Sequence, residues 1–186
     1  MRLKSVFLAG PDAYAPGAAQ LLEQKRKVLE TAGLALLTAS APRPSAPEGA
    51  EITARSAYAE VLTDLRRSDA LIANLTPWRG VGCHPAAAFL AGFAAALGKP
   101  VFAYMNIEDE GDAEILGRVE RLYGADLGGD GAWRDEEGSL IEDLGLPETV
   151  MLWAEARRFY VIVTDAPQSD ASGFQLCVDA LRLYAD

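Results

Sequence analysis

The sequence predicts an α/β protein: a three-layer sandwich whose helices cover both faces of a five-stranded, mainly parallel sheet. Short apolar runs alternate along the chain with longer segments of helical periodicity. The run ALIANL at 70–75 is almost wholly apolar, as expected of a strand buried on both faces. A largely apolar helical segment at 85–97, which we expect to be buried nearly all round, then leads through Lys99-Pro100 to another apolar run at 101–104. This order predicts a β-α-β unit, whose two strands lie parallel.

Two strand–helix pairs are expected before this unit. The run SVFLA at 5–9 predicts the first strand, which Gly10-Pro11-Asp12 ends. A helix is expected from about 18 to 32, ended by Gly33, before a second strand at 34–37. Three prolines within 39–48 predict a loop. The next helix has apolar residues at the helical spacing, and we expect this stripe to face the core: Ala54, Ala57, Tyr58, Val61, Leu62 and Leu65.

The C-terminal half continues the alternation. An acidic loop at 108–112 precedes an expected helix at 112–123, whose predicted buried residues are Ile115, Leu116, Val119, Leu122 and Tyr123. Residues 124–138 are rich in Gly and Asp and are expected to be irregular. Pro147 is expected to open a helix that runs to about Arg157, before a fifth strand at 160–163. The last helix should bury Phe174, Cys177, Val178 and Leu181. We expect a single domain over 1–186.

The composition limits the class of partner. Half of the residues are apolar, a quarter are charged and the net charge is −10, which is typical of an acidic globular protein. An acidic chain lacks the basic surface that a nucleic-acid polymer or an anionic membrane requires. No signal peptide or membrane-spanning segment is expected. Cys83 and Cys177 have no metal-ligand spacing, so we expect no metal site and a reducing, cytoplasmic location.

The loop at 76–84 and the first turn of the following helix are the place to look for function. In parallel sheets ligands bind beyond the carboxyl ends of the strands, and this loop follows the central strand. Pro85 suits the first turn of a helix, where its missing N–H costs nothing. Gly80-Val81-Gly82 lacks the remaining spacing of a phosphate-binding glycine fingerprint, so we expect no nucleotide cofactor of that kind and no other cofactor.

Four segments together resemble one enzyme family. They are FLAGPDAY at 7–14, RSAYAEVLTDLRRSDALIANLTPWRG at 55–80, GFAAALGKPVFAY at 92–104 and IEDLGLPETVM at 141–151. In this order they resemble the nucleoside 2-deoxyribosyltransferases. The resemblance implies a flavodoxin-like fold, a nucleoside or nucleotide as ligand, and no cofactor. It also implies a homodimer or larger homo-oligomer, in which residues 147–151 reach the pocket of a neighbouring subunit.

The resemblance further implies a covalent pentosyl transfer, for which this chain lacks the usual residues. In the family a Glu in the first turns of the helix after the central strand attacks C1′ as the base departs. Leu90 occupies that position here, His84 replaces a preceding Asp, and Ala86-Ala87 replaces a Gly-Thr pair. Thr149 stands where the neighbour-reaching segment has an Asn. We therefore expect ligand binding, with the N-glycosidic transfer lost or redirected and no intact catalytic residue.

The same resemblance suggests which residues bind the ligand: Phe7, Gly10, Pro11, Asp12, Pro77, Arg79, Gly80, His84, Thr149 and Met151. For several of these a plain structural role is equally open. Arg79 either holds a phosphate or nucleobase carbonyl or faces solvent, and Trp78 either stacks on a base or covers an apolar edge.

Other residues that could replace the missing Glu also allow more than one interpretation. Asp12 is the best remaining carboxylate, or else a loop residue that bonds nearby backbone N–H groups. His84 lies at a helix N-terminus, where a neutral ring is expected; it binds ligand, activates a water or caps the helix. Cys83 is a nucleophile only if the helix lowers its pKa. Three functions therefore stay open: a ligand-binding protein without transfer, an active transferase or hydrolase using Asp12 or a His84-activated water, and a non-enzymatic assembly module.

Overall fold

The computed structural model describes residues 3–38 and 50–185, so the loop expected at 39–48 lies outside the described residues. Five parallel strands form the main sheet in the order β2-β1-β3-β4-β7. Their bounds are β1 (Ser5–Ala9), β2 (Ala35–Thr38), β3 (Ala70–Asn74), β4 (Val101–Ile107) and β7 (Ala156–Val163). This confirms the predicted α/β sandwich, and the strand order is that of flavodoxin-like folds.

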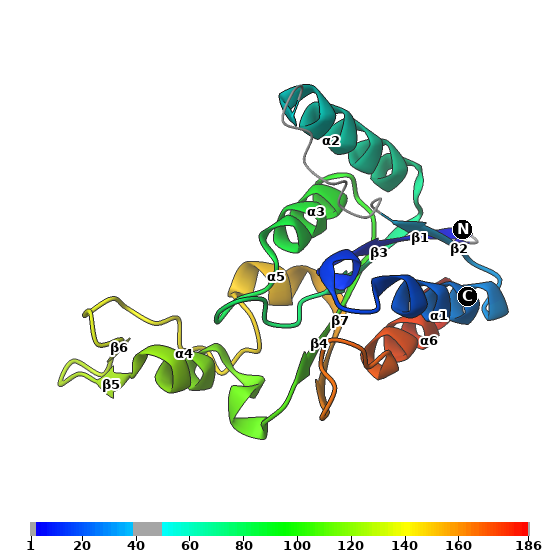
Figure 1. Ribbon diagram of the computed structural model, residues 1–186. Coiled ribbons are helices and arrows are strands. Elements are labelled where there is room, and N and C mark those ends of the chain that lie inside the picture. The colour runs from blue at the N-terminus through cyan, green and yellow to red at the C-terminus, as the bar shows by residue number, and fades with distance from the viewer. Residues whose placement is uncertain (1–2, 39–49, 186) are drawn as a thin grey trace.

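Helices cover both faces of this sheet (Figure 1). Helices α2 (Ala50–Arg67), α3 (Pro85–Ala96) and α5 (Val150–Glu155) lie on one face, and α1 (Ala18–Thr31) and α6 (Ser172–Ala185) lie on the other. Alternate residues of each strand supply the two apolar cores, because successive side chains point to opposite faces. On β1, for example, Phe7 and Ala9 join α2 and α3, whereas Val6 and Leu8 join α1 and α6.

The last helix matches its predicted pattern. Helix α6 buries the four side chains expected of it, Phe174, Cys177, Val178 and Leu181, none of which is measurably exposed. Its first turn packs closely on β4, since a side chain at Gly173 would collide with the ring of Tyr104. The apolar stripe of α6 therefore forms the centre of the core on this face of the sheet.

The helices of the opposite face are less buried than predicted. Helix α3 buries Ala87, Leu90, Ala91 and Ala94 but leaves Phe89 half exposed, so the expectation of burial nearly all round is wrong. The expected core stripe of α2 is also wrong in its first half. Only Leu62 and Leu65 of that stripe are buried, whereas Ala54, Ala57 and Tyr58 are exposed. Figure 1 shows the reason, because the first half of α2 extends beyond the sheet.

The segment between β4 and β7 also departs from expectation. Short helical turns η1 (Asp12–Tyr14) and η2 (Glu110–Ala113) follow β1 and β4, and α4 (Ile115–Tyr123) leads to the small antiparallel pair β5 (Asp126–Leu127) and β6 (Trp133–Arg134). Residues 124–138, expected to be irregular, contain this pair. The helix predicted to run from Pro147 to Arg157 begins only at Val150 and ends at Glu155. Ala156 already pairs with β4, so sheet pairing overrides the helical pattern there.

Helix α4 stands away from the sheet, which changes what it buries (Figure 1). Leu122 and Tyr123, two of its predicted buried residues, are 42% and 56% exposed. Its buried residue is instead Arg118. Among residues 3–38 and 50–185, no helix combines the length and the hydropathy needed to span a membrane.

Candidate functional site

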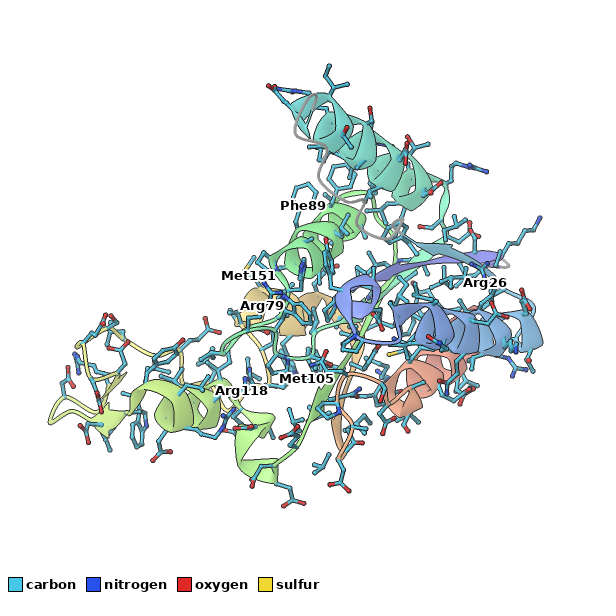
Figure 2. All side chains as sticks on the ribbon, in the orientation of Figure 1. Arg26, Arg79, Phe89, Met105, Arg118 and Met151 are labelled. Atoms are coloured by element: carbon cyan, nitrogen blue, oxygen red, sulfur yellow. The ribbon has the colours of Figure 1, made fainter. Side chains whose placement is uncertain are left out.

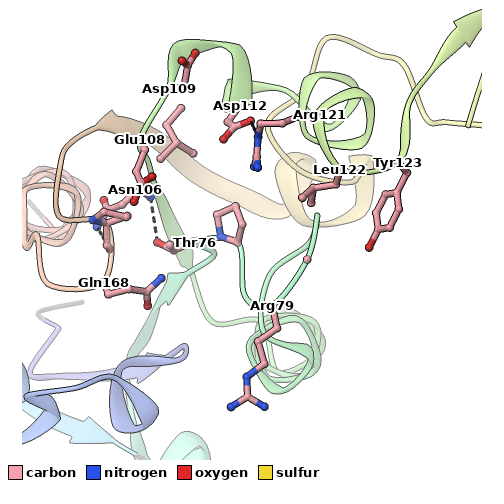
Figure 3. Close-up of a pocket in the computed structure, with 14 residues that line it drawn as sticks. Thr76, Arg79, Asn106, Glu108, Asp109, Asp112, Arg121, Leu122, Tyr123 and Gln168 are labelled. Atoms are coloured by element: carbon pink, nitrogen blue, oxygen red, sulfur yellow. Dashed lines mark hydrogen bonds and ion pairs between the residues drawn. The ribbon is translucent and has the colours of Figure 1, made fainter.

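A cleft of about 570 Å³ opens at the carboxyl edge of the sheet, between α4 and the loops that follow β3, β4 and β7 (Figure 3). This volume lies within the range of small-molecule sites, and the edge is where parallel sheets bind ligands. Its polar lining includes Thr76, Arg79, Asn106, Asp112, Arg121 and Gln168. The cleft is therefore the candidate ligand site.

The loop after β3 brings three of the expected ligand-binding residues to this cleft: Pro77, Arg79 and Gly80. Arg79 is exposed and has a φ of 55°, an uncommon conformation for a residue with a side chain. Its guanidinium lies 5.3 Å from the ring centre of Trp78. Trp78 thus supports the cation of Arg79, and an exposed cation at the cleft is the arrangement that a phosphate or a carbonyl requires.

The opposite wall carries most of the cleft's charge. Glu108, Asp109 and Asp112 come from the segment after β4, and Asp112 pairs with Arg121 at 2.7 Å (Figure 3). The hydrogen bond from Arg121 to Asp112 raises the pKa of the arginine. Among the described residues Arg79 makes no ion pair, and Figure 3 shows its side chain directed away from Asp112 and Arg121.

Asn106, at the end of β4, presents a buried acceptor in the cleft wall. Its side-chain Nδ2 donates to the carbonyls of Pro167 and Asp170, both at 2.9 Å, and its backbone N–H donates to Thr76 Oγ1 at 3.1 Å. The two carbonyls fix the amide orientation, and Oδ1 has no partner among the described residues. Asn106 was not among the predicted site residues, because the strand was expected to end at residue 104.

Arg118 joins the segments that shape the cleft. Its Nε donates to the carbonyl of Val81 at 2.8 Å, Nη1 to that of Asp112 at 2.7 Å and Nη2 to that of Pro147 at 2.7 Å. Burial lowers the pKa of this arginine, while Glu148 and Asp112 oppose that shift. Figure 2 shows Arg118 where α4 meets the sandwich. No local pattern indicates this role, because the three carbonyls come from distant segments.

Asp12 is buried and engaged by other side chains. Its side chain is 4% exposed, forms an ion pair with Lys25 and accepts a hydrogen bond from Asn74 Nδ2 at 3.2 Å. Lys25 also donates to the hydroxyl of Tyr104 at 2.6 Å. Burial lowers the pKa of Lys25, although Asp12 opposes the shift, and burial raises the pKa of Tyr104. The expectation that Asp12 bonds backbone N–H groups was therefore wrong, since side chains bind it.

His84 is the N-cap of α3. Its Nδ1 accepts a hydrogen bond from the backbone N–H of Ala86 at 3.2 Å, and its ring stacks on Tyr14 with centres 5.1 Å apart. Burial lowers the pKa of His84, and the cation of Arg79 lowers it further. An accepting Nδ1 places the proton of the neutral ring on Nε2. The capping interpretation therefore fits the geometry.

Cys83 does not have the environment of a nucleophile. Burial raises the pKa of its thiol to about 12, and the nearby carboxylate of Glu148 adds to that effect. A thiol with this pKa is protonated at neutral pH, and nucleophilic cysteines require the thiolate.

Leu90 is part of the core rather than of the cleft. It is 6% exposed and belongs to the apolar cluster that also contains Phe7, Leu65 and Ala87. The side chain at the family's nucleophile position thus lies among hydrocarbon groups, and the expected ligand contact of Phe7 has no exposed surface to make it.

Thr149 and Met151 lie elsewhere, at a second hollow of about 440 Å³ between α3 and α5. This hollow is largely apolar, and Met151 beside it is 78% exposed. The ten expected ligand-binding residues are therefore not gathered in one place within a protomer. Pro77, Arg79 and Gly80 line the cleft. Phe7, Pro11 and Asp12 are buried, and Thr149 and Met151 line the hollow.

Over the described ranges, no three potential metal ligands of the His, Cys, Asp and Glu types come together.

Several known proteins resemble this chain to different degrees. A 2-desoxiribosyltransferase from Leishmania mexicana has a similar structure, with a TM-score of 0.63 and 22% identity, over 95% of this chain and 97% of that one. A conserved protein from Enterococcus faecalis V583 is similar at a TM-score of 0.48 and 17% identity, over 96% of this chain and 99% of that one. A 2-deoxyribosyltransferase from Bacillus psychrosaccharolyticus is similar at a TM-score of 0.44 and 17% identity, over 54% of this chain and 72% of that one. A search of the curated proteins gives no match.

The family model described as nucleoside 2-deoxyribosyltransferase matches residues 6–151, most of the chain. This match begins in β1 and ends in α5, so it spans the first four strands of the sheet, the cleft loops after β3 and β4, and the segment with Thr149 and Met151. The chain therefore belongs to the nucleoside 2-deoxyribosyltransferase family.

Proposed function

We propose that this protein binds a nucleoside or nucleotide in the cleft at the carboxyl edge, and that the family's pentosyl transfer does not proceed through residue 90. The observation that carries the second part is the burial of Leu90 in an apolar cluster. Covalent transfer requires a carboxylate to reach the anomeric carbon as positive charge develops there. Leucine has no lone pair to offer, and a hydrocarbon environment would not stabilise that charge.

The remaining acidic groups offer limited substitutes. Asp12 would have to leave Lys25 and Asn74, and this would leave the buried ammonium group of Lys25 without its ion-pair partner. Of the carboxylates at the cleft, Asp112 is paired with Arg121, and Asp109 accepts the backbone N–H of Gly111 at 2.8 Å. Glu108 is the carboxylate at the cleft for which a catalytic role is simplest to test.

The lining of the cleft supports a nucleoside-like ligand. Pro77, Leu122 and Tyr123 offer apolar and aromatic surface, which suits a base or the face of a sugar. Thr76, Gln168 and Arg79 offer hydrogen-bonding groups, which suit hydroxyls, carbonyls or a phosphate. A mixed lining of this kind is typical of small-molecule sites.

Binding is tested by thermal unfolding and calorimetry with purine and pyrimidine deoxynucleosides and their 5′-monophosphates. A ligand that binds only the folded state raises the apparent melting temperature. We expect a rise that Arg79→Ala reduces and that Arg26→Ala, a matched change of an exposed arginine on α1, leaves intact. If none of these compounds raises the melting temperature, the binding proposal is wrong.

Chemistry is tested by incubating the protein with a deoxynucleoside and an acceptor base. We expect no base exchange above the rate without protein. Ready exchange would overturn the second part of the proposal, and comparison of Glu108→Gln with Asp12→Asn would then identify the carboxylate responsible. Binding and transfer are measured separately, so one part can stand without the other.

The proposal includes self-association. Residues 147–151 leave Met151 exposed beside the apolar hollow, and an exposed methionine at such a place suits insertion into a neighbouring subunit. Sedimentation velocity over a range of concentrations tests this. We expect an oligomer that Met151→Asp weakens, and a wild-type protein that stays monomeric would contradict the proposal.

A further inference from the structure

Three uncharged polar side chains gather at one end of the cleft, here named the amide corner. They are Thr76, which follows β3, Asn106, near the end of β4, and Gln168, which follows β7. Figure 3 shows the three together, at a distance from Arg79. Hydroxyl and amide groups both donate and accept hydrogen bonds without carrying charge. The amide corner therefore suits an uncharged polar group of a ligand.

Asn106 is held in one orientation and has one oxygen left over. Its Nδ2 donates both of its hydrogens, to the carbonyls of Pro167 and Asp170. Its backbone N–H is bonded to Thr76 Oγ1, so the main chain is fixed as well. Turning the amide over would set Oδ1 against two carbonyl oxygens, which cannot donate to it. Oδ1 is therefore the acceptor that Asn106 offers, and no described residue donates to it.

This unpaired acceptor is exceptional in the part of the chain that the structure describes. Asn106 is 1% exposed, so bulk water has little access to Oδ1. Buried side-chain polar atoms are mostly paired, because leaving one unpaired costs free energy. The other described residue with such an oxygen is Glu148, which does not line the cleft. An unpaired acceptor in the wall of a cleft is what a site needs in order to recognise a donor on its ligand.

The chemistry of the amide corner selects the base of a nucleotide rather than its phosphate. A phosphate dianion offers only acceptors, and the carboxylate of Glu108, two residues beyond Asn106, would repel it. Nucleobases carry N–H donors next to carbonyl or ring-nitrogen acceptors. The amide of Gln168 is exposed and can complement either kind of neighbour. Arg79, at the other part of the cleft, is then left for the sugar or the phosphate.

We infer that Asn106 determines the specificity of the cleft: its Oδ1 accepts an N–H of the nucleobase, and nucleosides without that donor bind more weakly. The inference rests on the ligand binding proposed above, and it adds which part of the ligand meets which wall of the cleft. It is independent of self-association and of whether any sugar transfer takes place.

The test is calorimetry of the full chain with two pairs of nucleosides. Thymidine is compared with N3-methylthymidine, which lacks the ring N–H, and deoxyadenosine with purine 2′-deoxyriboside, which lacks the amino group and adds no bulk. In the pair whose unmodified member binds, we expect loss of the donor to weaken binding about tenfold to a hundredfold, because Oδ1 then stays unpaired. The pair that responds tells a ring N–H from an amino N–H.

Variants then assign the effect to the amide corner. In Asn106→Leu, checked for folding by far-UV circular dichroism, the two members of each pair should bind alike. Arg79→Ala should weaken both members by the same factor. Gln168→Ala should weaken binding, while Gln24→Ala, a matched change of an exposed glutamine on α1, leaves it unchanged.

The outcomes separate this inference from the proposed function. If none of the four nucleosides binds, the proposed binding is wrong and the role of Asn106 falls with it. If the unmodified nucleosides bind and their donor-free partners bind equally well, binding stands and the role of Asn106 is refuted. This comparison uses the wild-type protein, so it decides the question even if Asn106→Leu does not fold.

Discussion

Leu90→Glu restores the residue type of the family's nucleophile, and we expect the variant to be an unstable protein rather than a working transferase. The carboxyl group would enter the apolar cluster that also contains Phe7, Leu65 and Ala87. Residue 90 is 6% exposed, so water could hardly solvate a charged carboxylate at this position.

Two contributions set the size of the effect. Loss of the apolar burial of leucine costs about 2 kcal/mol. Burial of a carboxyl group without a hydrogen-bond partner costs a further 2 kcal/mol or so even in its neutral form. The sum of about 4 kcal/mol is large against the total stability of roughly 5–15 kcal/mol that domains have. Leu90→Met, which conserves volume, should cost less than about 1.5 kcal/mol.

The pH dependence distinguishes a buried carboxyl from a mere packing defect. Burial disfavours the charged form, so the pKa of the introduced carboxyl group in the folded Leu90→Glu variant would lie above its value of about 4.3 in the unfolded chain. The folded state then holds a proton that the unfolded state releases, and stability falls as pH rises from that value through the folded pKa. The loss relative to wild type should therefore be larger at pH 7 than at pH 4.5. Leu90→Gln, whose side chain does not titrate, should lose the same amount of stability at both pH values.

Urea unfolding followed by far-UV circular dichroism at both pH values measures these differences. A Leu90→Glu variant as stable as wild type at pH 7 would refute the apolar environment inferred for residue 90. The same sample is then assayed for base exchange, where we expect no brisk transfer. His84 and Ala86-Ala87 have also replaced family residues, so the single change does not rebuild the site.

Further predictions concern four groups around the sheet. His84 should be neutral at pH 7, with its proton on Nε2. Because its pKa is lowered in the folded protein, its contribution to stability should be lost as the pH falls below about 6.5. NMR of this one histidine measures its tautomer and its pKa. His84→Ala should cost about 1 kcal/mol through the lost cap, with His84→Asn recovering most of it in chemical unfolding. Burial would raise the pKa of Asp69, but hydrogen bonds from the start of β1 lower it overall. The stabilisation by Asp69 should therefore persist above about pH 4 and be lost as the pH falls through the pKa of the folded state. Asp69→Asn should reduce this loss of stability at acid pH. Lys25→Met should cost about 3–5 kcal/mol by leaving Asp12 charged and unpaired, and adding Asp12→Asn should recover most of that loss. Arg118→Met should cost at least about 3 kcal/mol, because it leaves three carbonyls without their donor; equal stability of mutant and wild type would show that the guanidinium is dispensable.

The sheet was predictable because its signals are local. The strands at 5–9 and 70–75 are continuous apolar runs, and each matches its strand in the structure to within a residue. The stripe of α6 has the helical period and meets the sheet along its whole length. Where a helix with a regular apolar stripe was less buried than predicted, the cause was its position relative to the sheet. The stripe of α2 is as regular as that of α6, but half of it lies past the sheet, and no local pattern encodes where a sheet ends.

The candidate site was less predictable because its contacts join distant segments. The position of Lys25 fits the buried stripe between Leu21 and Leu29, so the periodicity did contain a signal for its burial. Its partner Asp12 follows the first strand and also lies in a segment that resembles the family, so the sequence pointed to it in two ways. Asn106 and Arg118, in contrast, acquire their roles from carbonyls of other loops, and backbone carbonyls leave no trace in a sequence.

Leu90 and the Asp12–Lys25 pair act in the same direction on different sides of the sheet. Leu90 replaces a reacting acid by hydrocarbon in the core under α3, whereas Lys25, from α1, engages the one carboxylate that follows β1. Neither position therefore offers a free negative charge at the part of the carboxyl edge formed by β1 and β3. The open cleft lies farther along that edge, at β3, β4 and β7, and its lining comes from other segments. The proposed function therefore assigns ligand binding and sugar transfer to separate parts of this edge, so loss of transfer would not require loss of binding.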